Sequence, residues 1–184
     1  SIHIDEPGYD RLVCLGDITW DNYQVETRMT LNNFTSNFAG LGFIHGWAGH
    51  TSDPPTGLSG QPFAGAPLGA LAWYRVFGGI NPERLEISNF IDDTEIRQKV
   101  DDSGFTLEPG KTYHFRSRTQ TLSNGKVLYT LKAWEDGQPE SAGGLIQALN
   151  DSVQPVGSLC VVTFFADFTV GPTTVIPIGN TPAS

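Results

Sequence analysis

Alternation of apolar and polar residues is the feature that most constrains this chain. In the segment "NYQVETRMTL", alternate side chains share one face of an extended strand: Tyr23, Val25, Thr27, Met29 and Leu31. The same period of two recurs in "TYHFRSRTQ" (112–120) and "VLYTLKAWED" (127–136). These two segments are joined by "SNGK", whose Asn-Gly pair favours the positive φ angles of a tight turn. The pattern predicts half-buried strands and a β-hairpin over 112–136.

Further strands are predicted wherever short apolar runs lie between Gly, Pro, Asn and Asp clusters. These segments are 10–17, 39–47, 68–77, 84–90, 95–100, 158–168 and 173–178. The one helix-like stretch is "SAGGLIQALND" (141–151), which two glycines weaken. About ten strands with so little helix predict an all-β fold, an antiparallel two-sheet β-sandwich formed by a single domain over residues 1–184.

Charge excludes several classes of partner. The 184 residues carry 11 Lys and Arg against 20 Asp and Glu, which gives a net charge of -9 and a pI of about 4.7. Such a surface repels a phosphate backbone, so neither nucleic acid nor an anionic membrane is an expected partner. No apolar run approaches the roughly 18 residues that a membrane span needs.

The two cysteines, Cys14 and Cys160, lie in the apolar segments "RLVCLG" and "SLCVVTFF" without metal-type spacing. They form either one disulfide or two buried thiols, and the spacing alone does not choose between these alternatives.

Several phrases occur in an order that resembles the concanavalin A-like jelly rolls, in particular laminin-G-like domains of secreted carbohydrate-active proteins. They are "ITWDNYQVE", "GLGF", "PLGALAWYR", "YHFRSR", "YTLKAWEDGQPE" and "FFADFTVGPTTV", and together they span nearly the whole chain. The resemblance implies a jelly-roll sandwich, a carbohydrate or polysaccharide partner and a secreted, extracellular protein. Two sequons, at Asn33 and Asn150, agree with secretion.

Catalytic signatures of this superfamily are absent. Retaining glucanases of the fold carry a Glu-x-Asp-x-x-Glu strand that places two carboxylates on one face. Here Asp92 and Asp93 are adjacent and point to opposite faces, as do Glu83 and Glu86. The Gln-Ile-His and Tyr-x-Lys motifs of jelly-roll alginate lyases are also missing. These absences favour binding over catalysis.

A structural calcium ion is implied by the resemblance. Domains of this fold often hold Ca²⁺ between a carboxylate of the last long strand and oxygens near the N-terminus. By that resemblance the metal residues are Asp167 in "FADFTV" with Glu6 and Gly8 in "DEPG". The alternative is that Asp167 faces solvent or caps a turn.

Residue types that bind sugars occur on both sides of a long segment at 46–67. This segment contains five glycines and four prolines. It is predicted to be an ordered loop at the rim of a binding site. Sugars stack on aromatic rings and accept or donate hydrogen bonds through their hydroxyls. The predicted carbohydrate-binding residues are His45, Trp47, His50, Trp73, Tyr74, Arg75, Arg116 and Trp134. Alternation places Trp73 and Arg75 on one side of their strand and Tyr74 on the other.

The polar faces of 22–30, 113–120 and 127–134 add a charged surface that is either a binding floor or a solvated outer face. It comprises Glu26, Arg28, His114, Arg116, Arg118, Lys132 and Trp134. Its cations suit an anionic or hydroxyl-rich glycan.

Three functional hypotheses follow. The first is a non-catalytic, lectin-like domain that binds a polysaccharide or glycan, free-standing or as a module of a larger secreted enzyme. The second is a glycoside hydrolase or polysaccharide lyase of the same fold. Its acid and base would come from Glu26, Glu86, His45, His114 and Tyr74. The third is a protein-interaction or adhesion domain.

Overall fold

The structure is a computed structural model that describes residues 1–4, 8, 11–48, 68–78, 81–91, 94–150 and 156–179. Most of the predicted rim loop at 46–67 lies outside these residues, as do His50 and Glu6.

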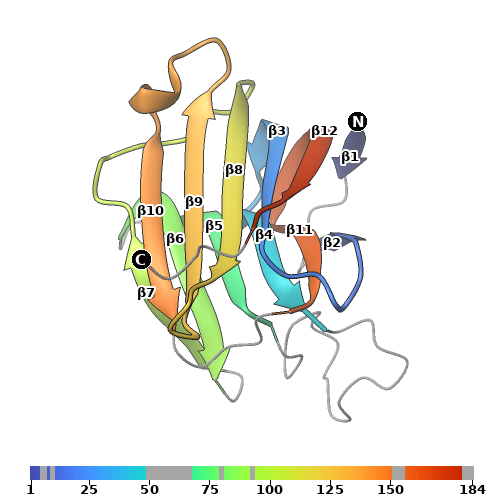
Figure 1. The fold of residues 1–184 in the computed structure, drawn as a ribbon. Helices are drawn as coiled ribbons and strands as arrows, with labels where there is room; N and C mark the ends of the chain where they lie inside the picture. Colours follow the sequence, from blue (N-terminus) through green and yellow to red (C-terminus); the bar gives the residue numbers. More distant parts are fainter. Residues whose placement is uncertain are drawn as a thin grey trace.

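Two six-stranded antiparallel sheets pack face to face (Figure 1). Sheet A has the order β1 (Ile2–Ile4), β12 (Ala166–Pro177), β3 (Tyr23–Phe34), β8 (Thr112–Thr121), β9 (Val127–Glu135) and β10 (Gly144–Asn150). Sheet B has the order β2 (Arg11–Leu15), β11 (Ser158–Phe164), β4 (Phe38–Trp47), β5 (Ala70–Phe77), β6 (Asn81–Ile91) and β7 (Thr94–Val100). The prediction of an all-β, two-sheet sandwich is confirmed.

The core lies between the sheets and follows the predicted alternation. On β3 the side chains of Val25, Met29 and Leu31 are buried, and on β8 Tyr113 and Phe115 are buried with them. The hairpin between β8 and β9 is also confirmed. Gly125 has a φ of 81°, and the backbone N–H of Leu122 donates to the carbonyl of Lys126 (2.8 Å).

The predicted helical stretch at 141–151 is wrong, because the chain forms a single turn of 3-10 helix, η1 (Glu140–Ala142), and then β10. Buried and exposed residues alternate along β10, so Ile146 faces the core while Leu145 and Leu149 face solvent. The short apolar run could not distinguish a helix from a strand, and pairing with β9 decided the outcome.

The last two predicted strands have different bounds in the structure. Phe165 takes a φ of 48°, which ends β11 and turns the chain from sheet B into sheet A. The next strand, β12, then runs without interruption from Ala166 to Pro177. Its register against β3 shifts between Val170 and Thr173, where Gly171 and Pro172 form a bulge.

The cysteines form a disulfide. Cys14 on β2 and Cys160 on β11 are directly opposite each other in the antiparallel register. Among the described strands, β2 pairs only with β11, so the disulfide ties an edge strand to its one neighbour.

We expect the double substitution Cys14→Ser and Cys160→Ser to lower the free energy of unfolding by about 2 to 4 kcal/mol, because the bridge closes a long loop in the unfolded chain. Urea unfolding of the variant and of the native chain measures the difference. Reduction of the native chain should produce the same loss, and an unchanged urea midpoint in both cases would contradict the expectation.

Candidate functional site

The structure divides the described sugar-binding candidates among three regions of the sandwich. His45 and Tyr74 lie in the core between the sheets. Trp47, Trp73 and Arg75 belong to sheet B, where the two tryptophans join an apolar cluster outside the main core. Arg116 and Trp134 lie on the outer side of sheet A. His50 lies outside the described residues.

His45 is a structural residue rather than a ligand contact. Its side chain is fully buried, and its ring lies near those of Tyr23, Phe43 and Tyr129. The Ser117 hydroxyl donates to the carbonyl of Thr130 (2.7 Å). Because its one proton is used there, the Ser117 hydroxyl accepts from Nε2–H of His45 (2.7 Å). Nδ1 of His45 is then unprotonated and accepts from the Tyr23 hydroxyl (3.2 Å). Burial lowers the pKa of His45 to about 3 and keeps the ring neutral.

Tyr74 is also removed from the candidate site. Its side chain is fully buried, its hydroxyl donates to Oε2 of Glu83 (2.8 Å), and the backbone N–H of Leu107 donates to the hydroxyl (3.1 Å). Burial raises the pKa of Tyr74, and the adjacent Glu83 carboxylate adds to the shift. The hydroxyl therefore connects β5 to the chain before β8 and is not available to a ligand.

Trp73 and Arg75 contact each other on the outer side of sheet B. The Arg75 guanidinium lies 5.0 Å from the indole centroid and donates to Glu95 (2.7 Å). Trp73 is buried, and a Cβ at Gly40 would lie 2.5 Å from its ring, so the indole packs directly on β4. Glu86 beside it is fully buried and pairs with Arg84 and Arg97, each at 3.0 Å. The Glu86 carboxylate is thus enclosed by side chains of sheet B and has no exposed surface for a substrate.

The outer side of β3, β8 and β9, with the residues just after β9, carries charged side chains around one indole, and we call it the charged face. It contains Glu26, Arg28, His114, Arg116, Arg118, Lys132, Trp134, Asp136 and Glu140. Register explains the arrangement, because Glu26 is opposite Arg116 and Arg116 is opposite Lys132 in adjacent strands.

Arg116 is the centre of the charged face. Its Nε donates to Glu26 (2.9 Å), and its Nη1 donates to Glu140 (2.8 Å). Partial burial opposes the charge, but the two carboxylates outweigh it and raise the pKa of Arg116. Lys132 also donates to Glu140 (2.9 Å), so Lys132 and then Arg116 lower the pKa of that carboxyl.

The Trp134 indole contacts two side chains of the charged face, His114 and Arg116. The imidazole of His114 stacks on the indole with centroids 4.8 Å apart and planes 5° apart, and the Arg116 guanidinium lies 5.0 Å from the indole centroid. Only 6% of Trp134 is exposed, so the predicted indole has little surface left for a sugar. Its role on this face is to position His114 and Arg116.

A hollow of about 370 Å³ lies beside the charged face. Its walls come from β3, β8 and β12: Glu26, Thr27, Arg28, His114, Pro172, Thr174 and Ile176. Nε2 of His114 donates to the Asp136 carboxylate (2.7 Å), and its Nδ1 lies 3.6 Å from Glu26. One wall is thus polar and charged, and the other is formed by Pro172 and Ile176. We call this the charged-face hollow.

Sequence reasoning missed part of this site. Asp136 and Glu140 follow β9 in "EDGQPE", and their proximity to the strand's polar face was a usable signal. Pro172 and Ile176 gave no such signal, because the bulge that places Pro172 against β3 arises only when β12 pairs.

The predicted calcium residues are only partly described. Oδ1 of Asp167 accepts from Asn32 (2.8 Å) and contacts His3 (2.9 Å), and Asn32 and then His3 lower the pKa of Asp167. The carbonyl of Gly8 accepts from the N–H of Phe165 (2.9 Å). Within the described ranges there is no group of three or more His, Cys, Asp or Glu side chains suited to a metal ion. Glu6 lies outside the described residues, and calcium stays a prediction.

Comparison with known proteins identifies the fold. No known protein family matches the sequence, and no curated protein matches it. Carbohydrate-binding module CBM66 from Bacillus subtilis superposes with a TM-score of 0.58 at 13% identity, over 92% of this chain and 83% of the module. The chain is a jelly-roll β-sandwich.

Two further structures agree. Lactose- and MES-liganded congerin II matches this jelly roll with a TM-score of 0.52 at 12% identity, over 91% of this chain and 99% of congerin II. The PL-14 alginate lyase from Aplysia kurodai matches with a TM-score of 0.53 at 9% identity, over 89% of this chain and 72% of the lyase. Similarity at such identities shows the fold alone, and the finer concanavalin A-like and laminin-G-like assignments stay predictions. No helix among the described residues is long and apolar enough to cross a membrane.

Buried His45 predicts a loss of stability in mild acid. The unfolded chain protonates this histidine near its usual pKa of about 6.5, whereas the folded chain does so only near 3. Stability from this difference is therefore complete above the unfolded pKa and is lost as the pH falls toward 3. We expect a loss of about 2 kcal/mol in the free energy of unfolding between pH 7 and pH 5.

Urea unfolding at several pH values measures this loss, and His45→Gln is the comparison because glutamine does not titrate. The variant should have a shallower pH dependence whatever its absolute stability. Parallel curves for the variant and the native chain would show that another group causes the acid sensitivity.

A calcium site at Asp167 also predicts a measurable change. Calcium should raise the Tm of the native chain, and a chelator should reverse the rise, since a ligand that binds only the folded state stabilises it. Asp167→Asn should abolish the rise, because the amide loses the charge that Ca²⁺ prefers. Identical Tm values of the native chain with calcium and with chelator would rule the site out.

Proposed function

We propose that this chain is a non-catalytic carbohydrate-binding domain, and that the charged-face hollow binds the sugar. The observation that carries the proposal is the arrangement of fixed donors and acceptors beside an open hollow with an apolar wall. Sugars present hydroxyls that exchange hydrogen bonds with such groups and C–H surfaces that pack on apolar side chains.

Preorganisation supports this assignment. Arg116 is held by Glu26 and Glu140, and His114 is held by Trp134 and Asp136. Because these side chains already have defined partners, a ligand orders few additional rotamers when it binds. Arg28 differs, since its side chain is 57% exposed and lies 3.7 Å from Asp136. Its side chain is more exposed than those of Glu26 and His114, which also line the hollow.

Charge indicates the class of glycan. The charged face carries four cationic side chains, Arg28, Arg116, Arg118 and Lys132, against three carboxylates, Glu26, Asp136 and Glu140. This local excess of cations occurs in a chain of net charge -9. An anionic or hydroxyl-rich glycan therefore suits this face better than the rest of the surface.

The known proteins of the same fold support a carbohydrate ligand. One is named as a carbohydrate-binding module, and congerin II is described with bound lactose. The disulfide supports an extracellular location, because such bridges persist in oxidising compartments. On this proposal the protein acts outside the cell, free-standing or as a module of a larger secreted enzyme.

One observation favours the second candidate, a glycan-cleaving enzyme. Of the five acid and base candidates, His45, Tyr74 and Glu86 are fully buried, but Glu26 and His114 line the hollow with 3.6 Å between Oε1 and Nδ1. A carboxylate and an imidazole at this distance are capable of general acid and base chemistry. The experiment must therefore measure cleavage as well as binding.

A glycan array and a reducing-end assay on the same polysaccharide panel separate the hypotheses. We expect binding without new reducing ends. New reducing ends would support the enzyme. A panel that gives neither binding nor new reducing ends would support a protein-interaction or adhesion domain.

Arg28→Ala should weaken binding to the best array ligand by about 1 to 2 kcal/mol, because a charge-assisted hydrogen bond is lost. Isothermal titration measures the change. Lys99→Ala is the matched control, since it removes an exposed cation from β7 of the other sheet. Equal affinity of both variants and the native chain would exclude the charged face as the site.

A further inference from the structure

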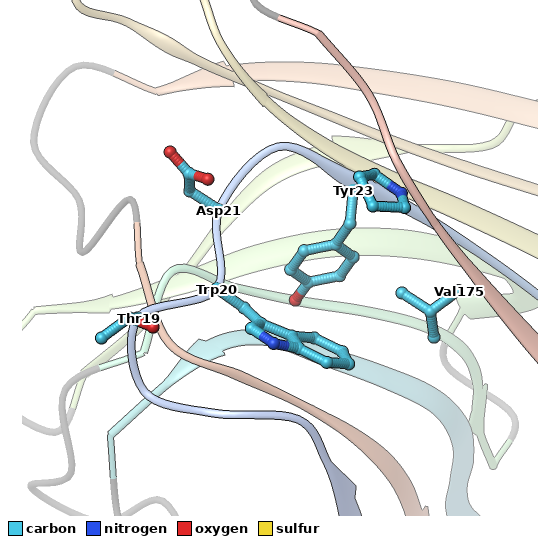
Figure 2. A pocket seen from close by; sticks show the side chains of 6 residues that line it. Thr19, Trp20, Asp21, Tyr23 and Val175 are labelled. Atoms are coloured by element: carbon cyan, nitrogen blue, oxygen red, sulfur yellow. The ribbon is translucent and has the colours of Figure 1, made fainter.

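A second hollow opens at the edge of the sandwich, on the connection between β2 and β3. Its volume is about 270 Å³, and the residues that line it are Thr19, Trp20, Asp21, Tyr23, Val175 and Pro177. Figure 2 shows the indole of Trp20 close to the phenol of Tyr23, with Val175 on one side of this pair and Thr19 and Asp21 on the other. We call it the Trp20 hollow, and it shares no lining residue with the charged-face hollow.

The hollow exists because the inner side of β12 is not fully covered at this edge. β1 pairs with residues 168–170 of β12, whereas β12 continues along β3 to Pro177. Val175 pairs with Val25, yet Val25 is fully buried and Val175 is only half-buried. Tyr23 borders the hollow with 3% of its surface exposed. Val175 and Trp20, which pack against the core and are half-buried, are thus partly exposed at this edge.

The connection between β2 and β3 holds Trp20 in a defined position. Gly16 has a φ of 86°, and a Cβ there would lie 2.4 Å from the indole, so the ring packs directly on the glycine. The N–H of Trp20 donates to the carbonyl of Asp17 (3.1 Å), and its own carbonyl accepts from Gly157 (2.9 Å). Thr19 donates to the Asp17 carboxylate from its N–H and its hydroxyl, each at 2.9 Å. The half-buried ring therefore needs no rearrangement to receive a ligand.

We infer that the Trp20 hollow binds one neutral sugar ring, as a second carbohydrate site separate from the charged face. Its volume lies just under the range of about 300 to 1,000 Å³ that is usual for small-molecule pockets, which suits a single pyranose. Trp20 and Val175 offer the apolar surface on which the C–H face of a sugar packs. The exposed carboxylate of Asp21 accepts hydrogen bonds from the hydroxyls of that ring or of the next one along the chain.

Charge selects a neutral sugar over an acidic one. Among the described lining residues there is no Lys or Arg, and Asp21 contributes a negative charge. A uronic acid or a sulfated sugar would be repelled by this carboxylate without a cation to compensate. The Trp20 hollow and the charged face therefore differ in the glycans that they favour, and either site can fail experimentally without the other.

The test follows the indole N–H resonance of Trp20 by NMR during titration with two panels, neutral oligosaccharides and uronic-acid oligosaccharides. Trp20→Phe identifies the resonance by its disappearance. We expect a neutral oligosaccharide to shift this signal and the uronic-acid panel to leave it in place. Trp20→Ala should weaken the binding of that neutral oligosaccharide at least about tenfold, whereas Lys99→Ala, on β7 of the other sheet, should not change it.

Two further variants keep the test decisive if Trp20→Ala disturbs the fold. Asp21→Asn preserves the shape of an exposed side chain and should weaken binding severalfold. Ile18→Ala is the matched control, because Ile18 lies in the same connection, is 40% exposed and is not among the lining residues. A Trp20 signal that no neutral oligosaccharide moves overturns the inference. Binding that is lost in Arg28→Ala but kept in Trp20→Ala also overturns it, while supporting the charged face as the site of the proposed function.

Discussion

The structure depends on filling the space between two sheets with alternate side chains from each strand. With little helical structure in the described residues to cover either sheet, each inner face must be buried against the other. The apolar side chains of β3, β4, β8 and β9 meet this requirement, and burial of their surface is the main favourable term in folding. One polar side chain inside the core is fully hydrogen-bonded: His45 joins sheet B to sheet A through Tyr23 and Ser117.

Because the inner faces of both sheets are buried in the core, only the outer faces and the edges can contact a ligand. The outer side of sheet B is partly closed, since Ile44, Trp73, Cys160 and Val162 are buried there and Glu86 is enclosed by arginines. The outer side of sheet A is instead polar across three adjacent strands. This asymmetry between the two outer faces, more than any single motif, points to the charged face as the candidate site.

Both hollows arise from the path of β12. At Gly171 and Pro172 its bulge places Pro172 and Ile176 beside the polar side chains of β3, which forms the charged-face hollow. Further along, the same strand extends past its pairing with β1 and leaves Val175 half-buried beside Trp20. One irregular strand, second from the edge of sheet A, thus borders a charged site on its outer side and an aromatic one on its inner side. A domain with two such sites could contact two rings of different charge.

The sequence by itself determined the fold class, most strand positions and the charged face. A period of two is a local property of extended chain, so the alternation in 22–31, 112–120 and 127–136 could be interpreted without knowing which strands pair. The same alternation correctly predicted that Trp73 and Tyr74 lie on opposite faces of their strand. Only the tertiary structure decided which sheet each strand joins and whether a polar side chain points inward. His45 was therefore placed in the core, Arg116 on the surface, and 144–150 in a strand. The Trp20 hollow depends on residues more than 150 positions apart, which no local pattern could bring together.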